Sequence, residues 1–327
     1  LSGIYLAPFI AAGILNPFLI KSSIDSLEMQ QRLFEVLRLN TLFFGVLSIV
    51  LTTYIAKKYF KWNPFFTTFL FVVNPIFLTL SNYFKYDIAL IFWIIISFLF
   101  LLKYSLKSNS VNLFLSAFFS GIALSVKLSA IPLLPIFIST FLLFNINRKK
   151  YFGELIVGIL VFIFTFLLFG IPDLILGKGN ITEYLYDNLI RAPSHVQNYI
   201  LNMSHWMYVI TKGVPSVFGF ALSLAAFLGL FLVVKNVFKN KFTDTKRNSF
   251  ILLLVSLFFF VVSLIPLGIE ARGNRLLVLL PFIALISGIF VEKFKKVLIV
   301  LLGLLLLFQT IESFSWIYIK LQIDPRQ

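Results

Sequence analysis

Residues 145 to 170 read NINRKKYFGELIVGILVFIFTFLLFG, a short basic link followed by a long apolar run. The run from 152 to 170 is close to the roughly 20 apolar residues that a helix needs to cross a bilayer. The link carries Arg148, Lys149 and Lys150, and short links rich in Lys and Arg stay on the cytoplasmic side of a membrane. This stretch therefore predicts a spanning helix that starts at the cytoplasmic face.

The same alternation of apolar runs and short polar links continues through the chain. Of its 327 residues 60% are hydrophobic, 41 are Phe and only 13% are charged. One water-soluble core cannot bury so much apolar surface, so lipid must be the solvent. We expect an all-α protein, a polytopic transmembrane helical bundle of about ten spans. The spans lie near 38 to 56, 64 to 80, 88 to 102, 111 to 127, 130 to 144, 152 to 170, 213 to 234, 249 to 267, 276 to 290 and 297 to 315.

Five links set the expected orientation, because they hold 16 of the 28 Lys and Arg. They are residues 57 to 61, 103 to 110, 145 to 151, 235 to 247 and 292 to 296. By the positive-inside rule they face the cytoplasm, as in a multi-pass protein of the cell membrane. The net charge of +15 is spread over these links and not gathered on one basic face, which argues against a nucleic-acid partner. The chain has no Cys, which excludes disulfides, thiolate nucleophiles and Cys-ligated metals.

The segments between and before the spans predict three outer elements. Residues 1 to 20 are apolar, but Pro8 and Pro17 interrupt a helix, so we expect an outer interfacial helix there. Residues 21 to 37 follow as a polar outer link, to which we assign no function. Residues 171 to 212 form an outer loop far longer than the usual connection of about 4 to 6 residues, and a loop of that length usually has a function.

The expected organisation has three parts. Residues 1 to 37 hold the interfacial helix and polar link, residues 38 to 316 form the transmembrane bundle with the outer loop, and residues 317 to 327 begin a further outer segment. The chain opens on Leu1 without an initiator Met and stops at Gln327 without a closing element, so we expect more sequence at both ends.

Ionisable residues at the outer ends of the spans are the candidate functional residues, since polar groups at membrane depth are costly and tend to face a cavity or pathway. Asp87 stands where the third span begins and Lys127 where the fourth ends; Glu270, Arg272 and Arg275 lie between the eighth and ninth. Each has a structural alternative: Asp87 as a carboxylate that the helix dipole stabilises, Lys127 as a snorkelling lysine, and the two Arg as topological anchors. Two Arg in a short outer link oppose the positive-inside tendency, so their placement favours an anionic ligand.

The long outer loop adds a weaker set of candidates. His195 and His205 are ten residues apart, a spacing that matches no compact metal motif, so interfacial histidines are the simpler interpretation. Arg191, close to His195, would complete a phosphate site if the loop folds over the cavity.

Four stretches in this order make the chain resemble the GT-C superfamily of glycosyltransferases, in particular family 39, the dolichyl-phosphate-mannose protein mannosyltransferase-like and aminoarabinose-transferase-like enzymes. The stretches are RLNTLFFGVLSIVLTTYIAKKYF (38 to 60), NPIFLTLSNYFKYDIALIFW (74 to 93), GIALSVKLSAIPLLP (121 to 135) and ARGNRLLVLLPFIAL (271 to 285). The final DPRQ also looks like the Asp-x-Arg that opens an outer soluble segment in many relatives. The likeness runs over the whole chain and implies a GT-C type bundle.

The resemblance implies an enzyme that transfers a sugar, with inversion, from a polyprenyl-phosphate donor in the membrane lipid to a protein, lipid or glycan acceptor on the outer face. Lys127, Arg272, Arg275 and Arg191 would hold the donor phosphate, and Asp87 and His195 would orient the substrate. Asp87 could equally orient a basic partner. The catalytic carboxylate of the family lies in the first outer loop, upstream of Leu1, so we assign no catalytic residue here. A divalent metal occurs in some GT-C enzymes and not in others, and a metal cofactor stays open.

Two other classes of function share some of these features. A polyprenyl-linked sugar flippase or other transporter would need midplane charges, broken helices and inverted repeats, and the sequence indicates none of them. A polysaccharide polymerase or ligase would use a large outer loop with Arg and His, which residues 171 to 212 could imitate. The Asp87 and Lys127 pattern favours family 39.

Overall fold

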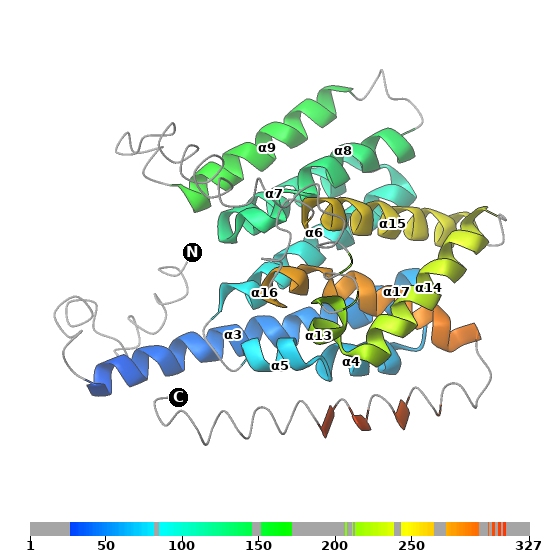
Figure 1. Ribbon diagram of the computed structural model, residues 1–327. Helices are drawn as coiled ribbons and strands as arrows, with labels where there is room; N and C mark the ends of the chain where they lie inside the picture. Colours follow the sequence, from blue (N-terminus) through cyan, green and yellow to red (C-terminus); the bar gives the residue numbers. More distant parts are fainter. Residues whose placement is uncertain are drawn as a thin grey trace.

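The computed structural model shows a bundle of helices, with no β-strand among the residues that it describes (Figure 1). These are residues 27 to 81, 85 to 145, 152 to 171, 207, 211, 213 to 238, 243 to 264 and 273 to 293, with scattered positions from 300 to 311. The predicted interfacial helix, nearly all of the long outer loop and the segment from 317 to 327 lie outside this set. The protein is thus all-α, as the sequence predicts.

Four of the described helices are long and apolar enough to cross a membrane. They are α3 (Leu27–Ile55), which runs on into the π-helical turn η1 (Ala56–Phe60), α6 (Tyr86–Lys107), α9 (Phe152–Gly170) and α15 (Asp244–Leu264). Shorter apolar helices pack beside them: α7 (Ser110–Val126), α8 (Leu133–Phe144), α14 (Phe220–Phe238) and α17 (Leu280–Lys293). α3 begins well before the predicted span at residue 38, because the intervening residues contain no Gly or Pro that would stop a helix.

The predicted span from 64 to 80 is two helices, α4 (Pro64–Val72) and α5 (Pro75–Ser81). Pro75 has no N–H to continue the helix and keeps Asn74 out of the helical region, so the chain breaks between them. The Asn74 side chain then caps α5 by accepting a hydrogen bond from the Phe77 N–H at 2.8 Å.

A second break separates α13 (Val214–Phe218) from α14. Gly219 stands between them with φ of 76°, a conformation that glycine adopts without steric cost. The predicted span from 213 to 234 is therefore a short helix followed by a long one.

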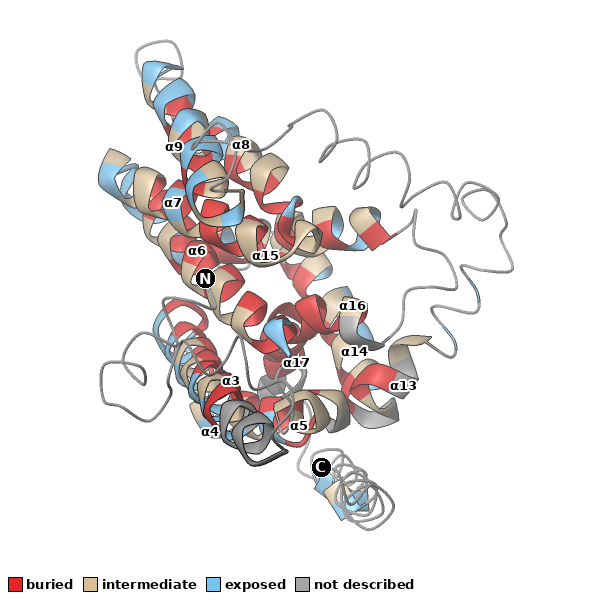
Figure 2. Cartoon of the chain, turned by 90° about the vertical axis from the view of Figure 1, so that its left-hand side faces the viewer, coloured by how far each residue is buried: buried red, intermediate tan, exposed pale blue. Residues whose placement is uncertain are grey.

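α6 lies at the centre of the bundle, packed against α3, α7, α8 and α15. Within the bundle 72% of its apolar span is buried, against 22% for the peripheral α9, a contrast that Figure 2 shows in colour. Serines line the seam between α6 and α7: the hydroxyl of Ser97 lies 3.1 Å from that of Ser116 and 2.7 Å from that of Ser120. Such interhelical hydrogen bonds satisfy polar groups that lipid cannot.

Glycines allow two of the helix pairs to approach closely. A Cβ on Gly121 of α7 would stand 2.6 Å from the Phe162 carbonyl oxygen of α9. A Cβ on Gly229 of α14 would collide with the Ile286 carbonyl of α17. Small residues at these positions bring the backbones together, the usual means of packing helices in lipid.

The ends of the helices that carry the basic links meet at one end of the bundle, which we call the basic end. There Asn248 of α15 donates a hydrogen bond to the Ser105 carbonyl of α6 at 3.2 Å, and the Trp62 and Phe250 rings lie 5.7 Å apart. A Cβ on Gly288 of α17 would also meet Trp62. The described parts of four basic links, around residues 57 to 61, 103 to 110, 243 to 247 and 293, thus share one end, the arrangement that the charge pattern predicts.

Candidate functional site

Asp87 lies in the first turn of α6, and the last turns of this helix lie at the basic end, so Asp87 stands at the opposite end of the bundle. α6 starts at Tyr86 because Lys85 before it is extended, with φ of −135° and ψ of 125°. A carboxylate in a first turn is favoured by the helix dipole. Only 2% of Asp87 is exposed, and a carboxylate withdrawn so far from solvent is costly unless a cation or several donors satisfy it.

Lys127 supplies that cation from a corner between two helices. Its backbone is extended, with φ of −162° and ψ of 137°, so α7 ends at Val126, one residue before the predicted end of the span at 127. The chain then turns through η2 (Leu128–Ala130) into α8, where Pro135 falls in the first turn, a position that tolerates proline.

The Lys127 Nζ donates a hydrogen bond to the Asp87 Oδ1 at 2.6 Å, a charge-assisted contact between residues 40 positions apart. The two side chains differ in access, since 3% of the carboxylate side chain is exposed against 21% of the lysine. The Lys127 Nζ also lies 5.3 Å from the centre of the Tyr86 ring, within range of a cation–π contact. The carboxylate is buried, and the lysine side chain is the partly exposed member of the pair.

This geometry suits the binding of an anion. A lysine ammonium has three N–H donors, and Asp87 accepts from one of them. Because the lysine side chain is partly exposed, its remaining N–H groups can donate to a ligand outside the pair. Asp87 therefore contacts the basic side chain of Lys127. This contact restrains a flexible lysine, which would otherwise lose side-chain entropy on binding a ligand.

Asn74 is a further residue of this region, and one that sequence reasoning missed. It is fully buried, caps α5 and donates through Nδ2 to the Val217 carbonyl of α13 at 2.9 Å. α5 in turn packs on α3 and α6. Asn74 thus fixes the short helix that precedes the Asp87 turn. The Asn-Pro pair at 74 and 75 was the available signal, because that dipeptide marks a turn.

Arg275 lies at the same end of the bundle as Asp87. It belongs to α16 (Gly273–Leu276), which continues through the 3₁₀ turn η7 (Leu277–Leu279), packed on α6, into α17. The Phe98 and Phe282 rings, 5.2 Å apart, join α6 to α17. At a rise of 1.5 Å per residue, Asp87 lies about 16 Å before Phe98 along α6. Arg275 lies about 11 Å before Phe282 along its own segment, in the same direction. Arg275 is half-buried.

The other candidate residues, Arg191, His195 and Arg272, lie outside the described residues. The structure thus brings Asp87 and Lys127 into contact and places Arg275 at their end of the bundle, while the convergence of all the candidates on one cavity stays a prediction. Among the described residues, no group of three His, Asp or Glu lies together as a set of metal ligands.

Comparison with solved structures shows the fold. The chain superimposes on ArnT from Cupriavidus metallidurans bound to undecaprenyl phosphate with a TM-score of 0.54 and 15% identity, over 80% of this chain and 46% of ArnT. The apo form of ArnT gives a TM-score of 0.51 and 16% identity, over 79% of this chain and 45% of that one. The chain spans less than half the length of these relatives. It therefore has the polytopic helical fold of a GT-C membrane protein.

Comparison of the sequence with protein families gives a match to dolichyl-phosphate-mannose-protein mannosyltransferase over residues 9 to 180, more than half of the chain. Comparison with curated proteins gives no match. The matched region contains α3 to α9 and with them both members of the Asp87 and Lys127 pair. The chain is an integral membrane protein and belongs to the dolichyl-phosphate-mannose-protein mannosyltransferase family within the GT-C superfamily.

Proposed function

We propose that the protein is part of a membrane glycosyltransferase that moves a sugar from a polyprenyl-phosphate donor to a protein, lipid or glycan acceptor, on the outer face and with inversion at the anomeric carbon. The observation that carries this proposal is the partly exposed Lys127 side chain, held by a buried carboxylate at one end of a lipid-embedded bundle. A donor with a lipid tail and a phosphate at the membrane surface suits such a cation. The family match and the fold support the same conclusion.

The reaction needs cations at the leaving group. The acceptor hydroxyl attacks the anomeric carbon, the bond from that carbon to the phosphate oxygen breaks, and the polyprenyl phosphate leaves with the electron pair. Negative charge grows on the departing phosphate, so a donor already in position stabilises the transition state more than the ground state. Lys127 gives one such donor, and Arg275, Arg272 and Arg191 are proposed to supply others. A carboxylate acting as general base, which the family resemblance places in the first outer loop, would take the proton of the acceptor hydroxyl.

Asp87 has a positioning role in this scheme. Its carboxylate is sealed and accepts from Lys127, so it acts on the donor phosphate through the lysine. The Tyr86 ring lies 5.3 Å from the same ammonium and makes a cation–π contact with it. His195 remains a proposed substrate-orienting residue of the long loop.

The charge distribution supports the proposed placement on the outer face. The pair lies opposite the basic end, and links rich in Lys and Arg stay in the cytoplasm. We therefore propose that donor and acceptor meet on the extracytoplasmic side. A phosphate on the cytoplasmic side would instead meet the basic links themselves.

The test is release of free polyprenyl phosphate by the full-length protein in liposomes that contain a panel of polyprenyl-phosphate sugars, with acceptors added. Lys127→Met is compared with Lys58→Met, an exposed lysine at the basic end that donates to the Tyr54 hydroxyl at 2.6 Å. We expect release that Lys127→Met abolishes and Lys58→Met leaves intact. Movement of the sugar-lipid across the bilayer, without release, would contradict the proposal and favour a flippase.

A further inference from the structure

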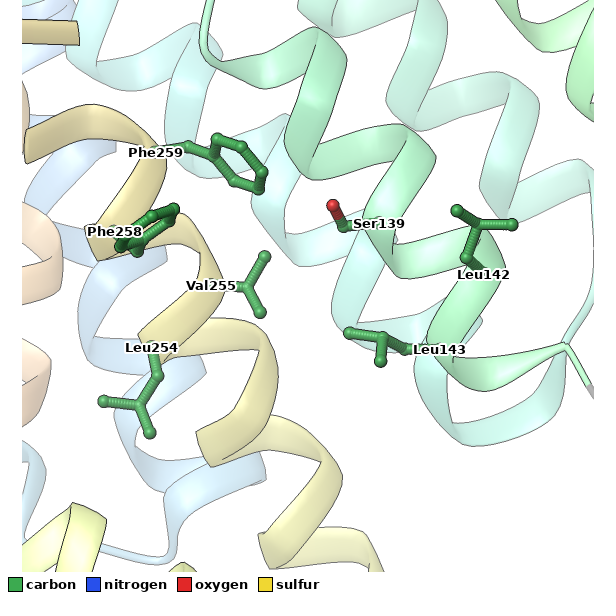
Figure 3. A pocket seen from close by; sticks show the side chains of 7 residues that line it. All are labelled: Ser139, Leu142, Leu143, Leu254, Val255, Phe258 and Phe259. Atoms are coloured by element: carbon green, nitrogen blue, oxygen red, sulfur yellow. The ribbon is translucent and has the colours of Figure 1, made fainter. Parts of the chain in front are cut away.

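A groove of about 470 Å³ lies between α8 and α15, on the outside of the bundle (Figure 3). Leu142 and Leu143 of α8 form one wall, Leu254 and Phe258 of α15 form the other, and Ser139 adds a hydroxyl. Leu143 is 52% exposed and Phe258 is 60% exposed, although both are large and apolar. In a bundle that spans a membrane, such a groove opens toward lipid.

The α15 wall of the groove continues toward a cation at the basic end. Arg247, Leu254 and Phe258 lie on one stripe of the helix, because residues 7 and 11 positions apart fall within about 20° of each other around a helix. Arg247 is exposed and stands about 10 Å beyond Leu254 along the helix axis, from a rise of 1.5 Å per residue. A phospholipid with one acyl chain in the groove would bring its phosphate to about this level.

Two hydrogen bonds hold the residues next to Arg247 and Lys107 at the same corner of the bundle. Asn248, next to Arg247, donates to a carbonyl of the last turns of α6 at 3.2 Å. Ser108, next to Lys107, donates to the last carbonyl of α8 at 3.0 Å. Arg247 and Lys107 are both exposed, and in the described part of the chain neither side chain has an ion-pair partner. Asp244, in the first turn of α15, is the acidic neighbour of this corner.

We propose that this corner binds an anionic phospholipid of the membrane, with one acyl chain in the groove and the phosphate between Arg247 and Lys107. The apolar walls match an acyl chain, and the two cations match a headgroup of net negative charge. Arginine binds phosphate through two parallel N–H donors, and the start of α15 adds the positive end of a helix dipole. A zwitterionic headgroup also brings an ammonium group, which the two cations repel. The site is separate from the Asp87 and Lys127 pair and does not depend on sugar transfer.

The test uses the full-length protein in nanodiscs of phosphatidylcholine and phosphatidylglycerol in equal amounts, from which it is released into native mass spectrometry. We expect one phosphatidylglycerol retained on each chain. The double variant Arg247→Gln/Lys107→Gln should bind it at least tenfold more weakly in a titration, equivalent to about 1.4 kcal/mol. Lys58→Gln removes a cation at the same end of the bundle but away from the groove, and should leave retention unchanged.

A groove variant separates the acyl chain from the headgroup. Leu143→Trp places a larger side chain at the opening and leaves both cations intact, so retention should fall tenfold here too. The proposal is wrong if phosphatidylcholine is retained equally, if the double variant binds phosphatidylglycerol as wild type does, or if undecaprenyl phosphate displaces it at equal concentration. The charge variants are at exposed positions, so they test the proposal even if the groove variant fails to fold.

Discussion

Removing the Lys127 side chain should damage this protein in two separable ways, on stability and on sugar transfer. Lys127→Met leaves the Asp87 carboxylate, 2% exposed, without its partner at 2.6 Å. Breaking a buried ion pair by removing one member costs about 3 to 5 kcal/mol, because an uncompensated charge stays buried. Asp87→Asn should cost less, about 1.5 to 3 kcal/mol, because the lysine that remains is 21% exposed and can reach water.

The double variant Asp87→Asn/Lys127→Met removes both charges and should be more stable than Lys127→Met alone. The coupling free energy between the two positions should therefore be at least about 2 kcal/mol. Reversible unfolding in mixed micelles of dodecylmaltoside and sodium dodecyl sulfate measures these free energies of unfolding. Lys58→Met, at an exposed position, serves as the matched control and should change stability by no more than about 0.5 kcal/mol.

Sugar transfer by the same variants distinguishes a phosphate ligand from a purely structural pair. Loss of one charge-stabilising donor typically lowers the rate by about 10² to 10³. Lys127→Met should therefore lose transfer, and the double variant should regain stability without regaining transfer. A double variant that recovers both would refute the phosphate role of Lys127, and additive effects on stability would refute the buried pair.

Three further changes test the packing and the site. Gly121→Ala should cost about 1 to 3 kcal/mol in the unfolding assay, since the new Cβ stands 2.6 Å from a carbonyl oxygen of α9; Gly153→Ala, which meets nothing within 4 Å, should cost nothing. Asn74→Ala should lower the free energy of unfolding by more than about 2 kcal/mol and lower sugar transfer, because it removes a buried bridge to α13. Asn63→Ala is the control, since it removes only an exposed cap worth about 1 kcal/mol. Equal costs for the two variants would contradict the bridging role of Asn74. Arg275→Gln should lower the rate of sugar transfer by about 10², with donor binding unchanged, if the Arg275 charge acts on the leaving phosphate. A variant that transfers sugar at the wild-type rate would show that Arg275 has no part in the site.

Much of the helix order follows from the sequence, and the misses have local causes. α9 occupies the predicted residues 152 to 170 because a basic link fixes its start and an unbroken apolar run fixes its length. The prediction of one helix from 64 to 80 was wrong because a hydropathy pattern does not detect the break at Asn74 and Pro75. The prediction of one helix from 213 to 234 was wrong for a similar reason, because Gly219 with its positive φ separates two helices.

The candidate site was predictable one residue at a time. Asp87 at the start of a span and Lys127 at the end of the next are visible as isolated charges beside apolar runs. Their pairing was not visible, because 40 residues and a complete helical hairpin separate them. Tyr86 gave no signal of its own as a site residue, since tyrosines are common at span ends. The Asn-Pro pair at 74 and 75 indicated a turn but no role in a site.

The sequence by itself determined that this chain is embedded in lipid, with its basic links at one end of the bundle, because apolar length and lysine placement act through local free energies of transfer. Only the tertiary structure decided which charged side chains pair with each other and which of them are accessible to a ligand. Packing of α6 against α7 seals the Asp87 carboxylate and leaves the Lys127 ammonium partly exposed. That difference in access depends on contacts between distant helices, and it sets which group can meet a ligand.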